Sequence, residues 1–183
     1  MKIIKILTLV LLLLGALLFG TLAYNGAFQK VNVEKGTQGG YWIVGFDHKG
    51  SYQEIGPTFN KIRDMVNAEN IDSNLYVGIY FDDPGKVEES KLRSIAGMII
   101  KDTTYLSKLK PNYPKLKLFS VPKSYSYFTE LETKGMISMI IAAIKAYPAL
   151  GESITKDKAA PNGQGLAFEE YHTGFTRFVM QVE

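Results

Sequence analysis

The sequence predicts an α+β fold made of two related halves, preceded by one apolar helix. Three observations support this prediction. The motif GIYFDD at 78–83 returns as GLAFEE at 165–170, and DHKG at 47–50 returns as ETKG at 132–135, at offsets of 87 and 85 residues. Between each pair of motifs lies a segment whose apolar residues have helical spacing. Ahead of both halves, residues 6–29 contain no charged side chain.

The first half is predicted to be strand–strand–helix–strand–strand. Alternating or β-branched residues predict strands near 30–36 and 41–47, with a glycine-rich turn between them. Apolar residues at helical spacing follow, with Ser51 as a helix cap. The predicted helix is then followed by strands over 74–83 and 91–100. The apolar positions that define the helix are Ile55, Phe59, Ile62 and Val66.

The second half is predicted to have the same order. Strands are expected over 115–121 and 125–135, followed by a strongly apolar helix that should end before Pro148. A short helical turn over 148–154 and a loop over 156–165 come next. Residues 166–183 predict two strands around a turn at 172–174.

Because a helix must bury its apolar stripe on a sheet, the repeat predicts a particular shape. We expect duplicated strand–helix–strand–strand units related by pseudo-twofold symmetry, with antiparallel sheets and the helices on one side. The domain covers 28–183, with pseudo-repeats at about 28–102 and 113–183. The free sheet faces are then expected to form a groove between the halves, where pockets commonly occur.

The N-terminal run predicts a single membrane-spanning helix, with residues 1–27 serving as a signal-anchor and short linker. The 18 residues from Ile6 to Ala23, apolar apart from two Thr and two Gly, would span roughly 27 Å, close to the hydrocarbon thickness of a bilayer. A cleaved signal peptide is the alternative, but its apolar region is usually about 7 to 15 residues. Lys2 and Lys5 on the N-terminal side favour a domain on the extracytoplasmic (periplasmic) side of the membrane. The lipid bilayer is therefore one expected partner.

Charge and motifs argue against several classes of function. Without Lys2 and Lys5 the net charge falls from +3 to about +1, and the basic residues are scattered, so no nucleic-acid partner is expected. No segment resembles a zinc site, a P-loop, a nucleotide fingerprint or a hydrolase elbow. We therefore assign no metal, no cofactor and no catalytic residue.

The candidate ligand site follows from strand alternation. If Val77 and Ile79, with Leu75 and Phe81, pack beneath the first helix, their neighbours Tyr80 and Asp82 face the groove. If Leu166 and Phe168 pack beneath the second helix, Glu169 and Tyr171 face the same groove. A carboxylate flanked by tyrosines suits a cationic or aromatic ligand. Trp42 and Tyr127, at equivalent positions in the two halves, are expected to add aromatic walls. The alternative is that the tyrosines are packing residues and Asp82 belongs to a solvated turn.

The order of several motifs resembles a known family. HKGSYQEIG, GIYFDDP, KLRSIAGMII and AFEEY are similar to positions in gyrase-inhibitor-like (effector-binding) domains, over about 28–183. AYPAL after the second helix is similar to the membrane-anchored branch that includes the testis-expressed endoplasmic-reticulum autophagy receptor. The resemblance implies a small-molecule-binding module in which an acidic cleft residue, here Glu169, recognises lipophilic cations. Some relatives hydrolyse strained cyclopropane-containing molecules with a cleft glutamate and aromatics.

Three functions remain open at this point. The first is a membrane-anchored protein that binds an amphipathic or cationic aromatic molecule in the cleft. The second is a hydrolase in which Glu169 activates water or protonates a leaving group, which would require a pKa raised by burial. The third is a partner-binding module whose groove is filled by its own side chains.

Overall fold

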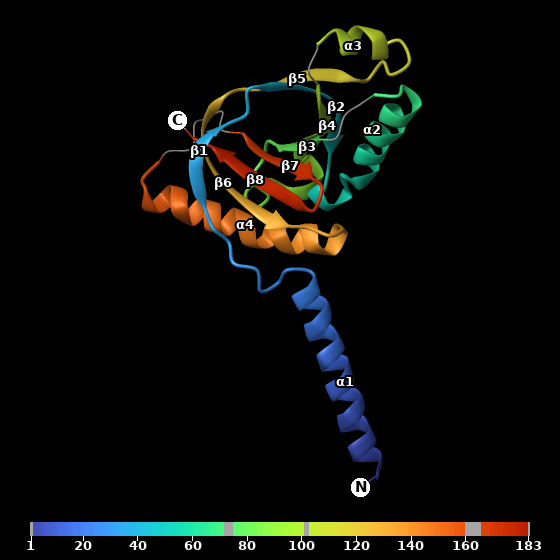
Figure 1. The fold of residues 1–183 in the computed structure, drawn as a ribbon, viewed down its shortest axis with the longest axis vertical. Helices are drawn as coiled ribbons and strands as arrows, with labels where there is room; N and C mark the ends of the chain where they lie inside the picture. Colours follow the sequence, from blue (N-terminus) through green and yellow to red (C-terminus); the bar gives the residue numbers. More distant parts are fainter. Residues whose placement is uncertain (1, 72–74, 101–102, 160–165, 183) are drawn as a thin grey trace.

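The structure is a computed structural model that describes residues 2–71, 75–100, 103–159 and 166–182. Figure 1 shows a compact domain from which one long helix projects. The helices are α1 (Lys2–Tyr24), α2 (Gly56–Ala68), α3 (Thr104–Leu109) and α4 (Met136–Lys156), with short 3₁₀ turns at Tyr52–Glu54 and Glu89–Lys91. The strands are β1 (Glu34–Gln38), β2 (Tyr41–Lys49), β3 (Tyr76–Tyr80), β4 (Arg93–Ile100), β5 (Lys117–Val121), β6 (Ser124–Glu132), β7 (Ala167–His172) and β8 (Phe175–Gln181).

All eight strands form one antiparallel sheet in the order β1-β6-β8-β7-β3-β4-β2-β5. The order is symmetric about the β3–β7 pair if β1 to β4 correspond to β5 to β8. The outer strands are exchanged, because β1 pairs with β6 of the second half and β5 pairs with β2 of the first. The predicted α+β fold with pseudo-twofold symmetry is confirmed, with the two expected sheets joined into one.

Both faces of this curled sheet are buried. On one face, α2 packs Ile62 and Met65 against Val44 and Met98. On the same face, α4 packs a row of small and branched side chains against Tyr127 and Phe178. The other face closes on itself around a second apolar core. That core consists of Ile43, Val77, Ile79, Ile95, Val121, Phe168 and Val179.

The predicted facing of the central strands is wrong. Val77, Ile79 and Phe168 lie in the core enclosed by the curl rather than beneath the helices. Their neighbours, including Tyr80 and Glu169, lie on the helix-bearing face. Alternation separates the two faces of a strand, but it cannot say which face carries a helix when both are buried.

Several predicted element boundaries also differ from the structure, including those of β1 and α4. The first strand is β1 at Glu34–Gln38 rather than 30–36, so it begins four residues later. Helix α4 continues through Pro148 to Lys156 instead of ending before the proline. A proline inside a helix costs about 3 kcal/mol. Burial of Ala146 before it and Leu150 and Ile154 after it on the sheet offsets that cost.

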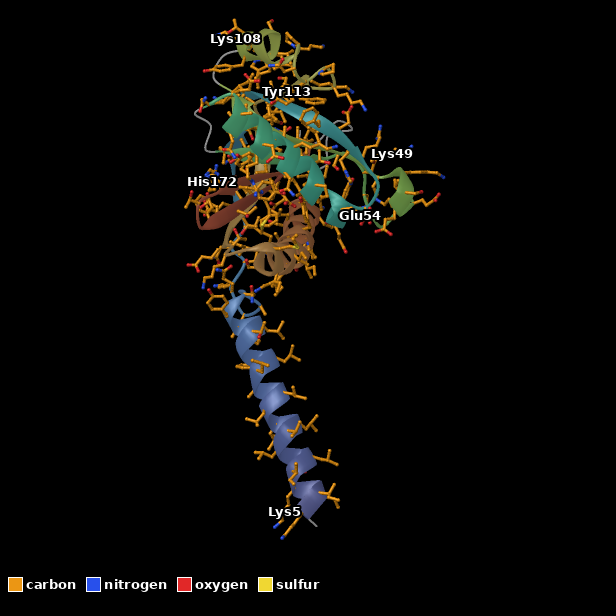
Figure 2. All side chains as sticks on the ribbon, turned by 90° about the vertical axis from the view of Figure 1, so that its right-hand side faces the viewer. Lys5, Lys49, Glu54, Lys108, Tyr113 and His172 are labelled. Atoms are coloured by element: carbon orange, nitrogen blue, oxygen red, sulfur yellow. The ribbon has the colours of Figure 1, made fainter. Side chains whose placement is uncertain are left out.

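Helix α1 stands clear of the domain, and Figure 2 shows Lys5 near its free end. Two helices of the described residues are long and apolar enough to cross a membrane, α1 and α4. Because α4 covers the sheet, it is a core helix of the domain. The 23-residue α1 has no buried residue, and its length and composition suit a membrane anchor or a signal sequence alike.

Candidate functional site

Glu169 lies in the middle of the sheet, on β7 directly opposite Gly78 of β3. Its side chain faces the helix-bearing side between α2 and α4, and only 8% of the residue is exposed. A Cβ atom at position 78 would lie 2.9 Å from the Tyr80 hydroxyl and 3.0 Å from the Tyr171 hydroxyl. Glycine at position 78 therefore leaves the space that the two tyrosine hydroxyls occupy beside Glu169.

Three tyrosines donate hydrogen bonds to the Glu169 carboxylate. The Tyr147 hydroxyl lies 2.8 Å from Oε1, and the Tyr171 hydroxyl lies 2.6 Å from Oε2. The Tyr80 hydroxyl lies 3.5 Å from Oε2 and 2.9 Å from the Tyr171 hydroxyl. Strands β3 and β7 and helix α4 thus converge on one carboxylate.

Further aromatic rings extend this cluster. Tyr52 meets the Tyr80 ring edge-on at 4.8 Å between centroids, and Phe59 of α2 meets the Tyr171 ring at 5.2 Å. On the side of α4, Tyr147 meets Phe178 at 5.8 Å. We call the set around the carboxylate the tyrosine–glutamate cluster. Its members are Tyr52, Phe59, Gly78, Tyr80, Tyr147, Glu169, Tyr171 and Phe178.

The cluster is electrostatically unusual because no basic side chain among the described residues pairs with Glu169. Burial raises the pKa of Glu169, and the three tyrosine hydrogen bonds only partly oppose that rise. Burial, with the nearby glutamate charge, raises the pKa of Tyr80, Tyr147 and Tyr171 well above the usual value. The tyrosines therefore stay protonated and act as donors to the carboxylate.

Asp82 lies outside the cluster, although the motif alignment made it equivalent to Glu169. It follows the end of β3, where both of its carboxylate oxygens accept hydrogen bonds from Arg93. These bonds hold the pKa of Asp82 below its usual range. Its backbone still touches the cluster, because the Tyr52 hydroxyl donates to the Asp82 carbonyl at 2.8 Å.

Trp42 and Tyr127 also lie elsewhere on the sheet. Trp42 is 45% exposed on β2, opposite Ile100 of β4. Tyr127 is buried beneath α4, and its hydroxyl donates to Asp157. Of the six site residues predicted from the sequence, the structure brings Tyr80, Glu169 and Tyr171 together.

Sequence reasoning missed Tyr52, Phe59, Gly78, Tyr147 and Phe178. Tyr147 and Phe59 lie on helices, and the inverted facing had placed both helices away from the groove. Alternation along β3 places Gly78 on the same face as Tyr80, but a glycine has no side chain that would mark it as a site residue. Tyr147 has no comparable sequence signal, since its position follows only from how α4 crosses the sheet.

A second polar cluster lies on the opposite face of β7. Glu170 is 3% exposed, and Arg177 of β8 donates to it at 2.9 Å. The Tyr41 hydroxyl donates to Glu170 at 2.7 Å, and a ring nitrogen of His172 lies 3.3 Å away. Arg177 also pairs with Glu130 at 2.5 Å. These contacts satisfy the charge of Glu170 within the protein.

Other features offer little for a metal or a ligand. No group of three or more metal-binding side chains is found in the part of the chain that the structure describes. A hollow of about 320 Å³ lies at Asp47–Lys49, Phe81, Arg93 and Ser94. Another of about 300 Å³ lies where the chain leaves α1 and meets the start of α4.

Comparison with known proteins agrees with the fold described above. A family model for GyrI-like small-molecule-binding domains matches residues 32–133, more than half of the chain. The chain belongs to the GyrI-like family. A comparison with curated protein sequences finds no significant match.

Several solved structures share this GyrI-like fold. SAV2435 bound to tetraphenylphosphonium is 11% identical, with 85% of this chain and 94% of that chain covered and a TM-score of 0.51. A hydrolase from Listeria innocua is 9% identical, with 84% and 93% covered and a TM-score of 0.51. EcmrR in a complex with DNA is 10% identical, with 91% and 63% covered and a TM-score of 0.59. At these identities the likeness concerns the fold alone.

Proposed function

We propose that this GyrI-like domain binds a lipophilic aromatic cation at the tyrosine–glutamate cluster. One observation carries the proposal: Glu169 is a buried carboxylate with aromatic neighbours and no basic partner among the described residues. A buried charge without a cation is costly, so a cationic ligand would supply the missing opposite charge. SAV2435, which shares the fold, was solved with an aromatic cation bound.

The geometry supports a particular mode of recognition for such a ligand. Tyr80, Tyr147 and Tyr171 are partly exposed, so the ligand reaches their rings before it reaches the carboxylate. Ring faces attract a cation through their quadrupoles, and Glu169 behind them adds a full negative charge at low local dielectric. The hydroxyls that now bond Glu169 keep the carboxylate oriented toward the ligand.

The test is to reconstitute the full chain in lipid nanodiscs and to titrate it with tetraphenylphosphonium. Tyrosine and tryptophan fluorescence reports the binding. We expect Glu169→Gln to weaken binding at least tenfold, and triphenylphosphine oxide, a neutral aromatic, to bind equally weakly to both proteins. Asp82→Asn is the matched control, because it removes a carboxylate already paired with Arg93. An affinity unchanged by Glu169→Gln would refute the proposed site.

We propose in addition that α1 is an uncleaved anchor, with residues 1–27 as anchor and linker and 28–183 as a domain on the extracytoplasmic side. Its 23 residues, its complete exposure and the two basic residues at its N-terminal end support this, as does the similarity of AYPAL to the membrane-anchored branch. Carbonate extraction of membranes and N-terminal sequencing test anchoring and cleavage. Protease protection of the domain in sealed cells or vesicles tests its side.

A hydrolase is the second candidate function. The observation that favours it is that burial raises the pKa of Glu169, because a carboxyl group whose pKa is raised toward the working pH is better suited to act as a general acid. A hydrolase from Listeria innocua shares the fold. Incubation with strained electrophiles tests this candidate, since turnover abolished by Glu169→Gln would establish it and product at the uncatalysed rate would exclude it.

A further inference from the structure

Helix α4 carries an exposed apolar stripe on the side that faces away from the sheet. Its members are Met136, Ile137, Ile140 and Ile144, with exposed fractions of 77%, 56%, 45% and 67%. The last three recur at the spacing of one helical face. The opposite side of the helix is buried on the sheet through Ala142, Ala146 and Leu150. The side chains of the stripe therefore do not contribute to the core of the domain.

The stripe lies beside the point where the chain leaves α1. Lys145 of α4 donates from its ammonium to the backbone carbonyls of Gly26, Ala27 and Gln29. Lys134, just before α4, lies with its ammonium 4.5 Å from the centre of the Tyr24 ring. These contacts attach the end of α1 to the first half of α4. Figure 1 shows α4 lying crosswise just beyond the end of α1, and Figure 2 shows the same adjacency from the side.

We propose that the α4 stripe lies on the surface of the lipid bilayer, as an interfacial helix beside the membrane-spanning α1. The proposal rests on the anchoring role proposed for α1. If α1 runs along the bilayer normal, a helix lying crosswise at its end runs along the membrane plane. An amphipathic helix in that orientation buries its apolar side chains at the boundary between headgroups and acyl chains. Tyr24 and Phe28, exposed at the same junction, are aromatic residues of the kind enriched at this depth.

This arrangement places the tyrosine–glutamate cluster close to the membrane. Tyr147 follows Ile144 by three residues, so it adjoins the stripe on the surface of the helix. Its hydroxyl contacts Glu169 on the flank of α4 that faces the sheet. A lipophilic cation concentrates in the bilayer, so the ligand would reach the cluster from the lipid rather than from bulk water. Membrane contact and ligand recognition would then share one helix.

The test uses the absence of cysteine in this chain. Single variants Ile140→Cys and Ile144→Cys in the full chain are labelled with an environment-sensitive fluorophore and reconstituted into phosphatidylcholine vesicles that contain doxyl-labelled lipid. Asn60→Cys on the exposed side of α2 is the reference position. We expect at least twofold quenching by shallow doxyl groups at 140 and 144, and none at 60. Circular dichroism confirms that each labelled variant is folded.

Three outcomes are distinguishable. Quenching confined to 140 and 144 supports the proposal. Equal and negligible quenching at all three positions overturns it. In the third outcome, the label at 144 is shielded from water but is not quenched by doxyl groups, and it becomes exposed when the protein is diluted in excess lipid. That result indicates that a second copy of the chain covers the stripe, and it also overturns the proposal. Carbonate extraction and tetraphenylphosphonium titration of the same vesicles report separately on the anchor and on the Glu169 site.

Discussion

Glu169 and Glu170 are neighbouring carboxylates on one strand, yet they lie in opposite environments. Because side chains alternate along β7, Glu169 faces the helices and Glu170 faces the core enclosed by the sheet. Both are less than a tenth exposed. Glu170 is paired with Arg177, whereas Glu169 has three tyrosine hydroxyls and no basic partner among the described residues.

The difference between their partners distinguishes a carboxylate that is neutralised within the protein from one that a ligand could neutralise. A buried ion pair that is complete within the protein contributes to a fixed structure and leaves nothing for a ligand to neutralise. A carboxylate held only by neutral donors keeps its charge uncompensated. Burial alone therefore does not distinguish the proposed ligand site, whereas the kind of partner of each carboxylate does.

The largest expected effect is on stability, at Glu170. Glu170→Gln leaves Arg177 with the half-exposed Glu130 as its one acidic partner among the described residues, and should lower the free energy of unfolding by about 2 to 3 kcal/mol. Glu169→Gln removes no ion pair and should not destabilise the domain at neutral pH. Urea unfolding of both variants measures the contrast. Equal destabilisation by the two changes would mean that the two carboxylates play the same role.

The next effect concerns the space beside Glu169. Gly78→Ala places a methyl group within 3.0 Å of the Tyr80 and Tyr171 hydroxyls and should cost about 1 to 2 kcal/mol while weakening tetraphenylphosphonium binding. Gly56→Ala, at the start of α2, is the control, because the added group would meet no atom within 4 Å apart from its chain neighbours and the backbone of its own helix. Thermal unfolding and ligand titration of both variants are the measurements. Loss of stability in the control alone would argue against crowding at position 78.

The pH dependence separates the two carboxylates further. Because the folded pKa of Glu169 is raised, the protonated carboxyl stabilises the folded state fully below the unfolded value of about 4.5, and this advantage is lost as pH rises through the raised pKa. The stability of the wild type relative to Glu169→Gln should therefore fall across that window. A cation favours the ionised form, so its affinity should rise with pH over the same range. Denaturation and ligand titration between pH 4 and 8 test the expected changes in stability and in affinity. Parallel pH profiles for the wild type and Glu169→Gln would contradict both expectations.

Particular residues show how far the sequence leads toward this structure. The repeated motifs predicted the duplicated α+β fold, and Glu169, Tyr171 and Tyr80 could be selected as one cluster because alternation kept them on one face. The same alternation could not reveal that Val77 and Ile79 enter a closed core, because the curl of the sheet depends on contacts distant in the sequence. The motif alignment likewise matched Asp82 to Glu169, because a sequence motif does not show that Asp82 lies beyond the end of β3 whereas Glu169 lies within β7.

The smallest expected effect separates the roles of the individual tyrosines. Tyr147→Phe removes the only tyrosine hydrogen bond to Oε1 of Glu169 among the described residues, while the ring against Phe178 remains. Tetraphenylphosphonium affinity should fall by no more than about fivefold, since the attraction of ring and carboxylate persists and one hydrogen bond contributes about 1 kcal/mol. Tyr127→Phe, which removes the hydroxyl bonded to Asp157 beneath the same helix, is the matched control and should leave affinity unchanged. A loss as large as that of Glu169→Gln would show that the hydroxyl of Tyr147, rather than the carboxylate charge, recognises the ligand.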